Sequence, residues 1–425
     1  MKKFLKDFIN KIWKISITFN LYFISALILA ILTKPISSKK KKNILVLAKP
    51  IFNEDIFALD RVSEDIGLLN FPRLLLNEIL YKYYESKKSL TEENYHALLD
   101  GSNTQREIYH HTLRIFKYLK QLIGFDGVIS GNYVYINQQE FFRAAIAENV
   151  PVFVLYKEGL APSGSFNDDI KARLYSGKIF NGTKIFFYNE ETRSLLVQEA
   201  VKGITYENSA VVGVPRLDRI LKGIEDKSNN KKIITFFGYS PIQKTKRFCE
   251  NDEIKILFEE CLMRFQNKFI DFAQQNKEWH IKLKFKSDHL SNQHLMRLRN
   301  DLENRKLNNI SFTNEKSLDL IKESKFIAGF ASTVLLEALA MRRNIIIPDT
   351  THLQDLSKTD YFYPMEGVAC YLKDSHGISE DFLNEQSKKI INEKSREFIL
   401  EKYLFRSDGF ASERLYNELY LSLSE

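Results

Sequence analysis

The stretch from Phe326 to Asp349, FIAGFASTVLLEALAMRRNIIIPD, limits the possible folds of this chain more than any other. A short apolar run ends at Gly329, and Ser332 and Thr333 then stand where a helix N-cap is expected. Apolar residues follow at helical spacing, and the β-branched run 345–347 is typical of a buried parallel strand. The pattern predicts a strand, a tight turn, a helix and a second strand.

A helix that begins directly after a strand is a place where an anion can bind, because its free N–H groups and its dipole point at the ligand. Thr333 and Glu337 are four residues apart and share one helix face. We therefore expect a phosphate beside Ser332 and Thr333, with Glu337 one turn below it, about where a ribose would lie. An ordinary βαβ crossover, in which Glu337 is satisfied within the fold, is the alternative that this stretch leaves open.

Strands and helices also alternate along the rest of the chain, which predicts an α/β fold with parallel sheets and covering helices. With 425 residues and 44% hydrophobic content, the chain is long enough for two such domains. The expected strands are 43–48, 125–130, 151–156, 184–188, 209–214, 232–237, 279–285 and 309–313. The expected helices are 71–84, 85–123, 138–149, 190–202, 252–276, 290–305, 318–324, 384–402 and 411–424.

A polar segment without periodicity, 222–232, separates the two sets of elements. We interpret it as the linker between an N-terminal Rossmann-like domain, 43–221, and a C-terminal Rossmann-like domain, 233–402. Two such domains facing each other would enclose a cleft, the usual place for a binding site. Residues 403–425 are expected to form a C-terminal helix that packs back toward this cleft, and residues 1–42 to form a membrane anchor.

The positive charge of the chain is concentrated in this anchor. The formal net charge is +8, and residues 1–42 alone hold ten lysines and one acidic residue, a net of +9, so the remainder is near −1. This distribution argues against nucleic acid as a partner and favours an anionic membrane surface.

The anchor contains an uncharged run, 15–32, whose length is at the lower limit for a membrane span. Five lysines precede the run and five follow it, so the positive-inside rule gives no orientation. Attachment in the plane of the membrane, or by a re-entrant segment, avoids carrying lysines across the bilayer and is the preferred interpretation. A true span, and a buried helix or signal peptide, are the alternatives.

Ligands of open α/β sheets bind beyond the carboxyl ends of the strands, so the polar residues there are the candidates. In the first domain these are Asn132, Lys157, Glu158, Arg216 and Asp218, and in the second they are Ser240, Lys284, Lys286, Ser332, Thr333 and Glu337. The second set, with two lysines, hydroxyls and a helix N-terminus, suits a phosphate. In the first set, Glu158 could act as a general base on an acceptor hydroxyl.

Each candidate has a structural alternative. Glu158 could be a solvated loop acid, and Lys284 and Lys286 could mark the wet face of a strand. Arg216 and Asp218 could form a local ion pair at a turn. No dinucleotide-binding, P-loop or zinc-protease motif occurs, no acidic pair has the spacing that a metal-dependent transferase needs, and the three cysteines lack metal-ligand spacing. The sequence thus predicts no metal, no disulfide framework and a reducing compartment.

Four motifs, in this order, resemble those of GT-B glycosyltransferases of bacterial surface or capsular polysaccharide synthesis, Kdo-transferase-like or CDP-glycerol glycerophosphotransferase-like. They are VVGVPRLDRI (211–220), HIKLKFK (280–286), GFASTVLLEALAMRRNIIIP (329–348) and DGFASERL (408–415). The resemblance covers residues 120–420 and implies that Ser332 and Thr333 contact the donor phosphate and that Glu337 lies near the ribose. It also implies that Asp408, Ser412 and Arg414 lie near the cleft.

The resemblance implies a metal-independent transfer from a CMP-, CDP- or UDP-linked sugar, without a separate cofactor, to a lipid-linked or polysaccharide acceptor. The expected location is the cytoplasmic face of a bacterial inner membrane. Glycerophosphotransferases have His-Gly where this chain has Lys157-Glu158-Gly159, and His-Pro where it has Lys284-Phe285. These departures favour a sugar transferase with Glu158 as base. A polyol-phosphate transferase, a nucleotide-sugar epimerase and a non-catalytic two-lobed binding or scaffold protein are the alternatives.

Overall fold

The computed structural model describes residues 2–38, 40–47, 49, 52–84, 95–96, 102–157, 177–198, 201–223, 231–238, 252–285, 293–330, 332–351 and 365–424. They form two compact units. Unit 1 contains the described residues up to 157 together with 177–218 and 409–424, and unit 2 contains those of 219–408.

Unit 1 is built on a seven-stranded sheet in the order β1-β3-β2-β4-β5-β6-β7. All neighbouring strands are parallel except the short edge strand β1, which runs antiparallel to β3. The strands are β1 (Lys34–Pro35), β2 (Lys42–Leu47), β3 (Ile66–Asn70), β4 (Gly127–Ser130), β5 (Val152–Tyr156), β6 (Lys184–Phe187) and β7 (Ser209–Val211).

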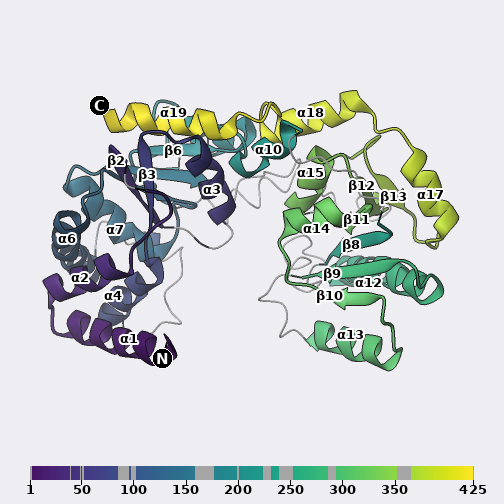
Figure 1. Cartoon of the computed structure of the whole chain (residues 1–425), viewed down its shortest axis with the longest axis horizontal. Helices are drawn as coiled ribbons and strands as arrows, with labels where there is room; N and C mark the ends of the chain where they lie inside the picture. Colours follow the sequence, from purple (N-terminus) through teal and green to yellow (C-terminus); the bar gives the residue numbers. More distant parts are fainter. Residues whose placement is uncertain are drawn as a thin grey trace. The chain divides into compact units, whose positions relative to one another are not determined.

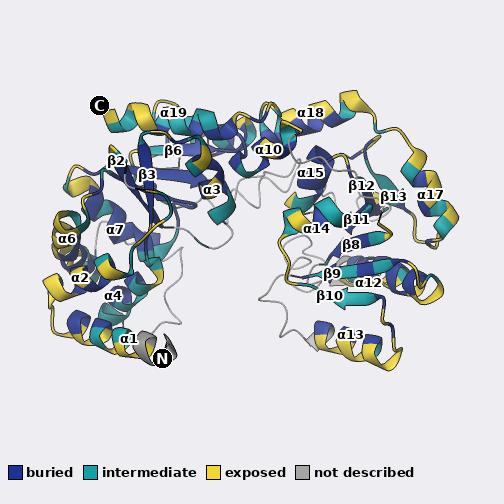
Figure 2. Ribbon diagram, in the orientation of Figure 1, coloured by how far each residue is buried: buried dark blue, intermediate teal, exposed yellow. Residues whose placement is uncertain are grey.

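The central strands of unit 1 are buried along nearly their whole length (Figure 2). This explains their continuous apolar sequences, since a strand covered on both faces needs no polar alternation. The helices are α3 (Asn53–Val62), α4 (Leu76–Tyr83), α6 (Asn103–Ile123), α7 (Ile136–Ala147), α9 (Glu190–Gln198) and α19 (Ala411–Ser424), with short helices η2 (Arg73–Leu75), η4 (Pro215–Leu217) and α10 (Asp218–Leu221). Figure 1 shows α19 along one side of the sheet and α6 and α7 along the other.

Capping residues in the sequence determine where helix α6 begins and ends. Its N-cap, Ser102, accepts a hydrogen bond from the amide of Gln105 at 3.1 Å. Its C-cap is Gly124, with φ of +66°, a left-handed conformation that favours glycine.

The N-terminal segment forms two helices, α1 (Lys2–Thr18) and α2 (Tyr22–Leu32). The chain turns between them at Asn20, whose φ of +57° is left-handed, a conformation that asparagine tolerates. The amine of Lys82, on α4, donates to the carbonyl of Ile17 at 2.9 Å and so ties this segment to unit 1. The apolar run 15–32 is thus divided between two helices. No helix in the described part of the chain combines the length and the apolar character needed to cross a membrane.

Unit 2 is built on a six-stranded parallel sheet in the order β10-β9-β8-β11-β12-β13. The strands are β8 (Ile233–Phe237), β9 (His280–Lys284), β10 (Ile310–Phe312), β11 (Phe326–Gly329), β12 (Asn344–Pro348) and β13 (Cys370–Leu372). The helices are α12 (Asp252–Gln275), α13 (Gln293–Asn304), α14 (Ser317–Glu323), α15 (Thr333–Ala340), α17 (Glu380–Lys388) and α18 (Glu393–Leu404).

Aromatic packing dominates one face of this sheet. Phe236 of β8 packs against Phe265 and Phe269 of α12, with ring centroids 5.7 and 5.4 Å apart. On the opposite side, the buried Arg396 of α18 donates to the carbonyls of Leu339 and Ala340 at 3.0 and 2.9 Å. These bonds satisfy the end of α15, where carbonyls have no partner within the helix.

Each sheet has one strand at which the direction of the strand order reverses. In unit 1 this strand is β2, which lies between β3 and β4, and in unit 2 it is β8, which lies between β9 and β11. At such a switch point the loops leave the carboxyl edge on opposite sides and open a crevice, where ligands of α/β proteins bind.

The structure adds elements that the sequence patterns did not predict. Strands β1, β3 and β13 and helix α3 were missed, and the single helix expected over 384–402 is two helices, α17 and α18, separated at 389–392. The predicted strand 209–214 is shorter, since β7 ends at Val211. Most of the predicted linker, 224–230, lies outside the described residues.

Candidate functional site

In unit 2, the turn after β11 and the start of α15 confirm the predicted strand, turn and helix. Ser332 is the N-cap of α15, and its hydroxyl accepts a hydrogen bond from the amide of Val334 at 3.4 Å. Strand β11 pairs in parallel with β8 on one side and with β12 on the other. The N-terminus of α15 therefore lies at the carboxyl edge next to the switch point of unit 2, where its dipole favours an anion.

Two side chains on this helix differ in exposure. Thr333, in the first turn, is exposed, whereas Glu337, one turn later, is only 6% exposed. The exposure of Thr333 leaves it accessible to a ligand, whereas the burial of Glu337 also fits the alternative in which this carboxylate is satisfied within the fold.

The loop after β8 approaches β9 closely at Gly238. Its amide donates to the carbonyl of Lys284 at 2.9 Å. A Cβ atom at position 238 would lie 2.1 Å from the ring of Phe285, so only glycine fits there. The hydrogen bond from Gly238 and the packing of Phe285 against it hold the backbone at the end of β9.

Lys284 ends β9 and is half-buried. Burial lowers the pKa of its amine, and the nearby charge of Glu315 acts in the opposite direction. Among the described residues, its amine has neither a hydrogen bond nor an ion pair. A lysine with this environment can donate to an anionic ligand without first breaking an internal pair.

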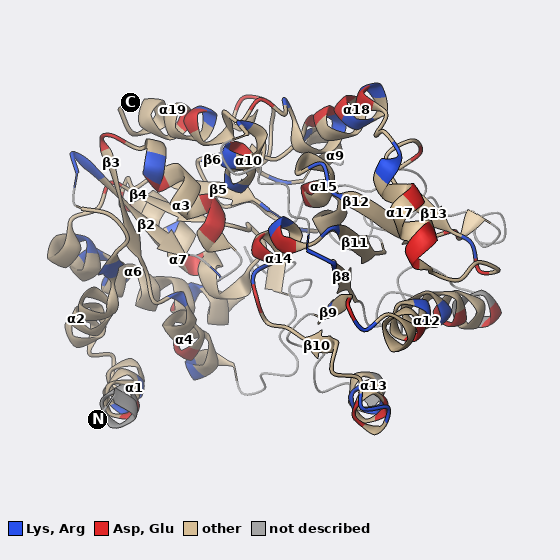
Figure 3. Cartoon of the chain, turned by 45° about the vertical axis from the view of Figure 1, so that its right-hand side comes forward, with Lys and Arg blue, Asp and Glu red and all other residues tan. Residues whose placement is uncertain are grey.

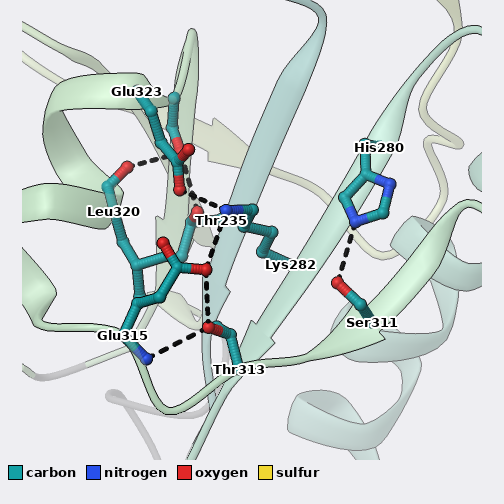
Figure 4. A network of polar contacts seen from close by, with 9 residues as sticks. Thr235, His280, Lys282, Ser311, Thr313, Glu315, Leu320 and Glu323 are labelled. Carbon is teal, nitrogen blue, oxygen red and sulfur yellow. Dashed lines mark hydrogen bonds and ion pairs between the residues drawn. The ribbon is translucent and has the colours of Figure 1, made fainter.

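The other lysine on the same face of β9, Lys282, is already engaged (Figure 4). Its amine contacts Glu315 at 3.0 Å and also forms an ion pair with Glu323 on α14. Burial acts to lower the pKa of Lys282, but the hydrogen bonds to Glu323 and Glu315 outweigh it and raise the pKa. At the start of the strand, His280 forms a hydrogen bond with the hydroxyl of Ser311 at 2.8 Å. Of the three polar residues of β9, Lys284 is therefore the one suited to a ligand.

In unit 1, Arg216 forms a buried contact with Asp55, a residue that the sequence patterns missed. Its guanidinium lies 3.2 Å from the Asp55 carboxylate, and its backbone amide donates to the same carboxylate at 3.2 Å. The hydroxyl of Tyr188 donates to Asp55 at 2.8 Å. Burial, and then the charge of Asp55, raise the pKa of Tyr188 well above its ordinary value. The three residues join the segments that follow β2, β6 and β7.

Asp218 does not need Arg216 as a partner, because it binds the start of α19. Its two carboxylate oxygens accept hydrogen bonds from the amides of Ala411 and Ser412 at 2.9 and 2.6 Å. Arg414, in the first turn of α19, donates to the carbonyl of Val212 at 2.9 Å. The motifs 211–220 and 408–415 are thus in contact, and their polar residues connect α19 to the end of β7.

The remaining candidates have different positions. Asn132 is buried in the turn after β4, where its side-chain oxygen accepts from the amide of Val134 at 2.9 Å. Lys157 directly follows β5. Asp408 lies in the turn before α19, where its backbone amide donates to the carbonyl of Arg406 at 2.6 Å. Glu158, Lys286 and Ser240 lie outside the described residues.

The described residues include no group of three or more His, Cys, Asp or Glu side chains that could hold a metal ion. The site in unit 2 is instead formed by a lysine, hydroxyls and a helix N-terminus, which together can stabilise phosphate charge.

Comparison with known proteins adds the fold to this geometry. No family model and no curated protein sequence matches the chain. Among solved structures, a protein assigned as a UDP-N-acetylglucosamine 2-epimerase from Listeria monocytogenes superposes with a TM-score of 0.50 and 12% identity, over 91% of this chain and 97% of that one. The UDP-GlcNAc 2-epimerase of Neisseria meningitidis superposes with a TM-score of 0.49 and 11% identity, over 89% of this chain and 100% of that one. The wall teichoic acid polymerase TagF superposes with a TM-score of 0.48 and 11% identity, over 99% of this chain and 95% of that one. The chain thus has a GT-B-like fold with two α/β units, and the sheet of each unit consists mainly of parallel strands.

Proposed function

We propose that this chain is a membrane-associated glycosyltransferase that transfers a sugar from a nucleotide-activated donor to a lipid-linked or polysaccharide acceptor. The observation that carries the proposal is that Lys284 ends one of the two strands beside β8 and the N-terminus of α15 follows the other, at the same carboxyl edge of the unit 2 sheet. Both groups stabilise negative charge, and the charge that develops on the leaving phosphate is what such a transferase must stabilise.

The donor would bind to unit 2 with its phosphates at Lys284, Ser332 and Thr333 and its ribose toward Glu337. We further propose Glu158 as the base that takes the proton from the acceptor hydroxyl, with no metal and no cofactor in the reaction. The acceptor hydroxyl would then attack the anomeric carbon of the sugar, and the bond from that carbon to the phosphate oxygen would break, which releases the nucleotide. Turnover by a folded Glu158→Gln variant at the wild-type rate would exclude this role of Glu158.

The proposed membrane association is supported by an exposed apolar surface on α1, α2 and the turn between them. We call it the apolar N-terminal surface, and it consists of Phe8, Ile15, Phe19, Leu21, Phe23, Ile24, Leu27 and Ile31. Phe19 is 69% exposed and Ile31 is 66% exposed, while α2 carries no charged residue (Figure 3). Lysines precede this surface, lie within it at Lys11 and Lys14, and follow it in sequence, a combination that suits the interface of an anionic bilayer. The location that we propose is the cytoplasmic face of a bacterial inner membrane.

Sedimentation with lipid vesicles tests this association. The chain should bind vesicles that contain phosphatidylglycerol more strongly than pure phosphatidylcholine vesicles. Phe19→Asp and Ile31→Asp should each weaken binding by about tenfold or more, since burial of such a side chain is worth about 1.5–3 kcal/mol. Phe398→Asp in unit 2, where the replaced side chain is 62% exposed, is the matched control and should bind like wild type. Equal binding of all variants would remove the support for membrane association.

Donor binding is tested by thermal unfolding of the chain in the presence of CMP, CDP, UDP, GDP or ADP. A nucleotide that binds the native state raises the midpoint by mass action. We expect one nucleotide to stabilise the chain, and Glu337→Ala to abolish the effect. CMP would indicate an ulosonic acid donor, CDP a polyol phosphate, and UDP or GDP a hexose. A cooperative transition that no nucleotide shifts would favour a non-catalytic scaffold.

A nucleotide-sugar epimerase is the second candidate, because the Listeria protein with this fold is assigned that activity. Fold alone does not choose between the two. Incubation of UDP-N-acetylglucosamine with the chain, in the absence of any acceptor, separates them. Epimerised product would identify an epimerase, whereas the proposed transferase leaves the sugar configuration unchanged until an acceptor is added.

A further inference from the structure

Two cationic side chains approach one aromatic ring at the carboxyl edge of the unit 1 sheet. The amine of Lys49 lies 3.7 Å from the ring centroid of Tyr135, and the guanidinium carbon of Arg73 lies 5.9 Å from the same centroid. The two cationic centres are therefore no more than about 10 Å apart. Sequence patterns missed all three residues, because each is isolated in its own segment of the chain.

The topology of unit 1 brings these residues together. Lys49 follows β2, Arg73 begins η2 after β3, and Tyr135 directly precedes α7 after β4. Strands β3, β2 and β4 are neighbours, and β2 is the switch point of the sheet. The three residues thus lie where the general rule for open α/β sheets places a ligand.

Buried hydrogen bonds hold Tyr135 in place. The fully buried Gln139 donates from its side-chain amide to the carbonyls of Tyr133 and Tyr135, at 2.6 and 3.2 Å. The amide of Gln138 also donates to the Tyr135 carbonyl, at 3.0 Å. These bonds fix the backbone of Tyr135 at the start of α7, whose dipole adds positive potential at the same place.

The cluster is electrostatically suited to an anion. Burial lowers the pKa of Arg73, which means that its positive charge is poorly solvated in the fold. The amine of Lys49 approaches the same ring, so two positive charges lie at this edge of the sheet. An anion bound beside both side chains would interact favourably with two positive charges.

We propose that Lys49, Arg73 and Tyr135 form a binding site for the phosphate or diphosphate group of the acceptor. Two cations beside a helix N-terminus match a multiply charged group, and the guanidinium fork can hold two oxygens of one phosphate. The proposal rests on the proposed function in one respect, namely that unit 1 binds the acceptor. It adds that the acceptor carries a phosphate, as a lipid-linked diphosphate or a phosphorylated sugar does.

Calorimetric titration of the full chain with inorganic pyrophosphate tests the site. The titration is done in the Lys284→Ala background, so that the lysine of the unit 2 site does not contribute. Lys49→Ala and Arg73→Ala should each weaken pyrophosphate binding by about tenfold or more. Lys117→Ala, which removes an exposed lysine of α6 paired with Glu148, is the matched charge control and should have no effect. Equal affinity in all these variants, or no measurable affinity in the background chain, would overturn the proposal.

Two further measurements exclude unfolding as the cause of lost binding and identify the phosphate compound that the site prefers. Thermal unfolding of each variant shows whether the variant is folded. If Arg73→Ala is not folded, Arg73→Lys is used in its place, because lysine keeps the positive charge but lacks the two-pronged guanidinium. Titration with farnesyl diphosphate and with glucose 1-phosphate then identifies the source of the phosphate, since a lipid-linked acceptor predicts tighter binding of the former. Failure here would leave the nucleotide screen unaffected. A screen without any stabilising nucleotide would reject the proposed function, and with it the acceptor as the source of the phosphate, while the pyrophosphate titration would still test whether the site binds an anion.

Discussion

The carboxylate of Asp218 accepts a hydrogen bond from the backbone amide of Ala411, 193 residues later in the chain, at 2.9 Å. The second oxygen accepts from the next amide, that of Ser412, at 2.6 Å. These two N–H groups open α19 and have no partner within the helix. Asp218 therefore acts as an N-cap supplied from a distant segment, and it connects the last helix of the chain to the sheet of unit 1.

Replacement of Asp218 by alanine should destabilise unit 1 by about 1–2 kcal/mol, the usual cost of removing a capping side chain. Two buried amides would lose their acceptor. Urea denaturation that follows the signal of unit 1 measures this change, with Asp301→Ala on the exposed side of α13 as the control. A wild-type midpoint in Asp218→Ala would show that α19 docks without this contact.

The pKa of Asp218 gives a second test at the same residue. Burial raises this pKa to about 6, although the bonds from Ser412 and Ala411 act to lower it. The folded pKa lies above the unfolded value, so the proton-linked stability is fully present below the unfolded pKa of 3.8 and is lost as the pH rises through 6. The difference in melting temperature between wild type and Asp218→Asn should therefore change between pH 4 and pH 7, in favour of wild type on the acid side. A difference independent of pH would contradict the raised pKa.

His111 should produce the opposite dependence. It is buried between α4 and the N-terminal helices, and burial, followed by the charges of Lys82 and Arg114, lowers its pKa to about 4. Here the folded pKa lies below the unfolded value of 6.5, so the unfolded state binds a proton first and stability falls as the pH drops from 6.5 toward 4. His111→Gln should remove this loss, measured as melting temperature against pH. Equal acid sensitivity of the variant and wild type would show that His111 is not the group responsible.

Local patterns were sufficient to predict the stretch from 326 to 349. The glycine, the N-cap Ser332, the helical spacing and the β-branched run each act over a few residues, and the structure confirms β11, α15 and β12. Strand β3 was missed because its apolar run is short and contains Gly67. The structure explains that glycine, because a Cβ there would lie 2.7 Å from the side-chain oxygen of Asn43.

Long-range contacts were beyond the reach of the sequence. A local pair between Arg216 and Asp218 was one interpretation, yet Arg216 pairs with Asp55, 161 residues away, and Asp218 with the start of α19. Nothing in the residues near position 55 signals that its carboxylate will be buried beside an arginine. For the site in unit 2, both Lys284 and Lys286 were candidates. Lys284 is partly buried at the end of β9, and Lys286 lies outside the described residues.

The two described lysines of β9 should respond differently to the same substitution. Lys284→Ala should weaken binding of the stabilising nucleotide by about tenfold or more, because a hydrogen bond to a charged group is worth about 1.5–3 kcal/mol, and should leave stability nearly unchanged. Lys282→Ala should instead lower stability, since Glu315 and Glu323 lose their shared cation. Nucleotide titration and thermal unfolding of both variants provide the comparison. If Lys282→Ala impaired binding more than Lys284→Ala, the assignment of the phosphate contact would be reversed.

The buried contact of Asp55 with Arg216 and Tyr188 should be the most sensitive polar site of unit 1. Asp55→Ala should cost about 3–5 kcal/mol, because it leaves the guanidinium largely buried without its partner. Tyr188→Phe should cost less, about 1–3 kcal/mol, since Asp55 keeps its bonds from Arg216. The double variant Asp55→Leu with Arg216→Met should recover much of the loss, because two apolar side chains replace a pair of buried charges. Denaturant midpoints of Asp55→Leu, Arg216→Met and the double variant measure this coupling, and strictly additive losses would show that the two residues act independently.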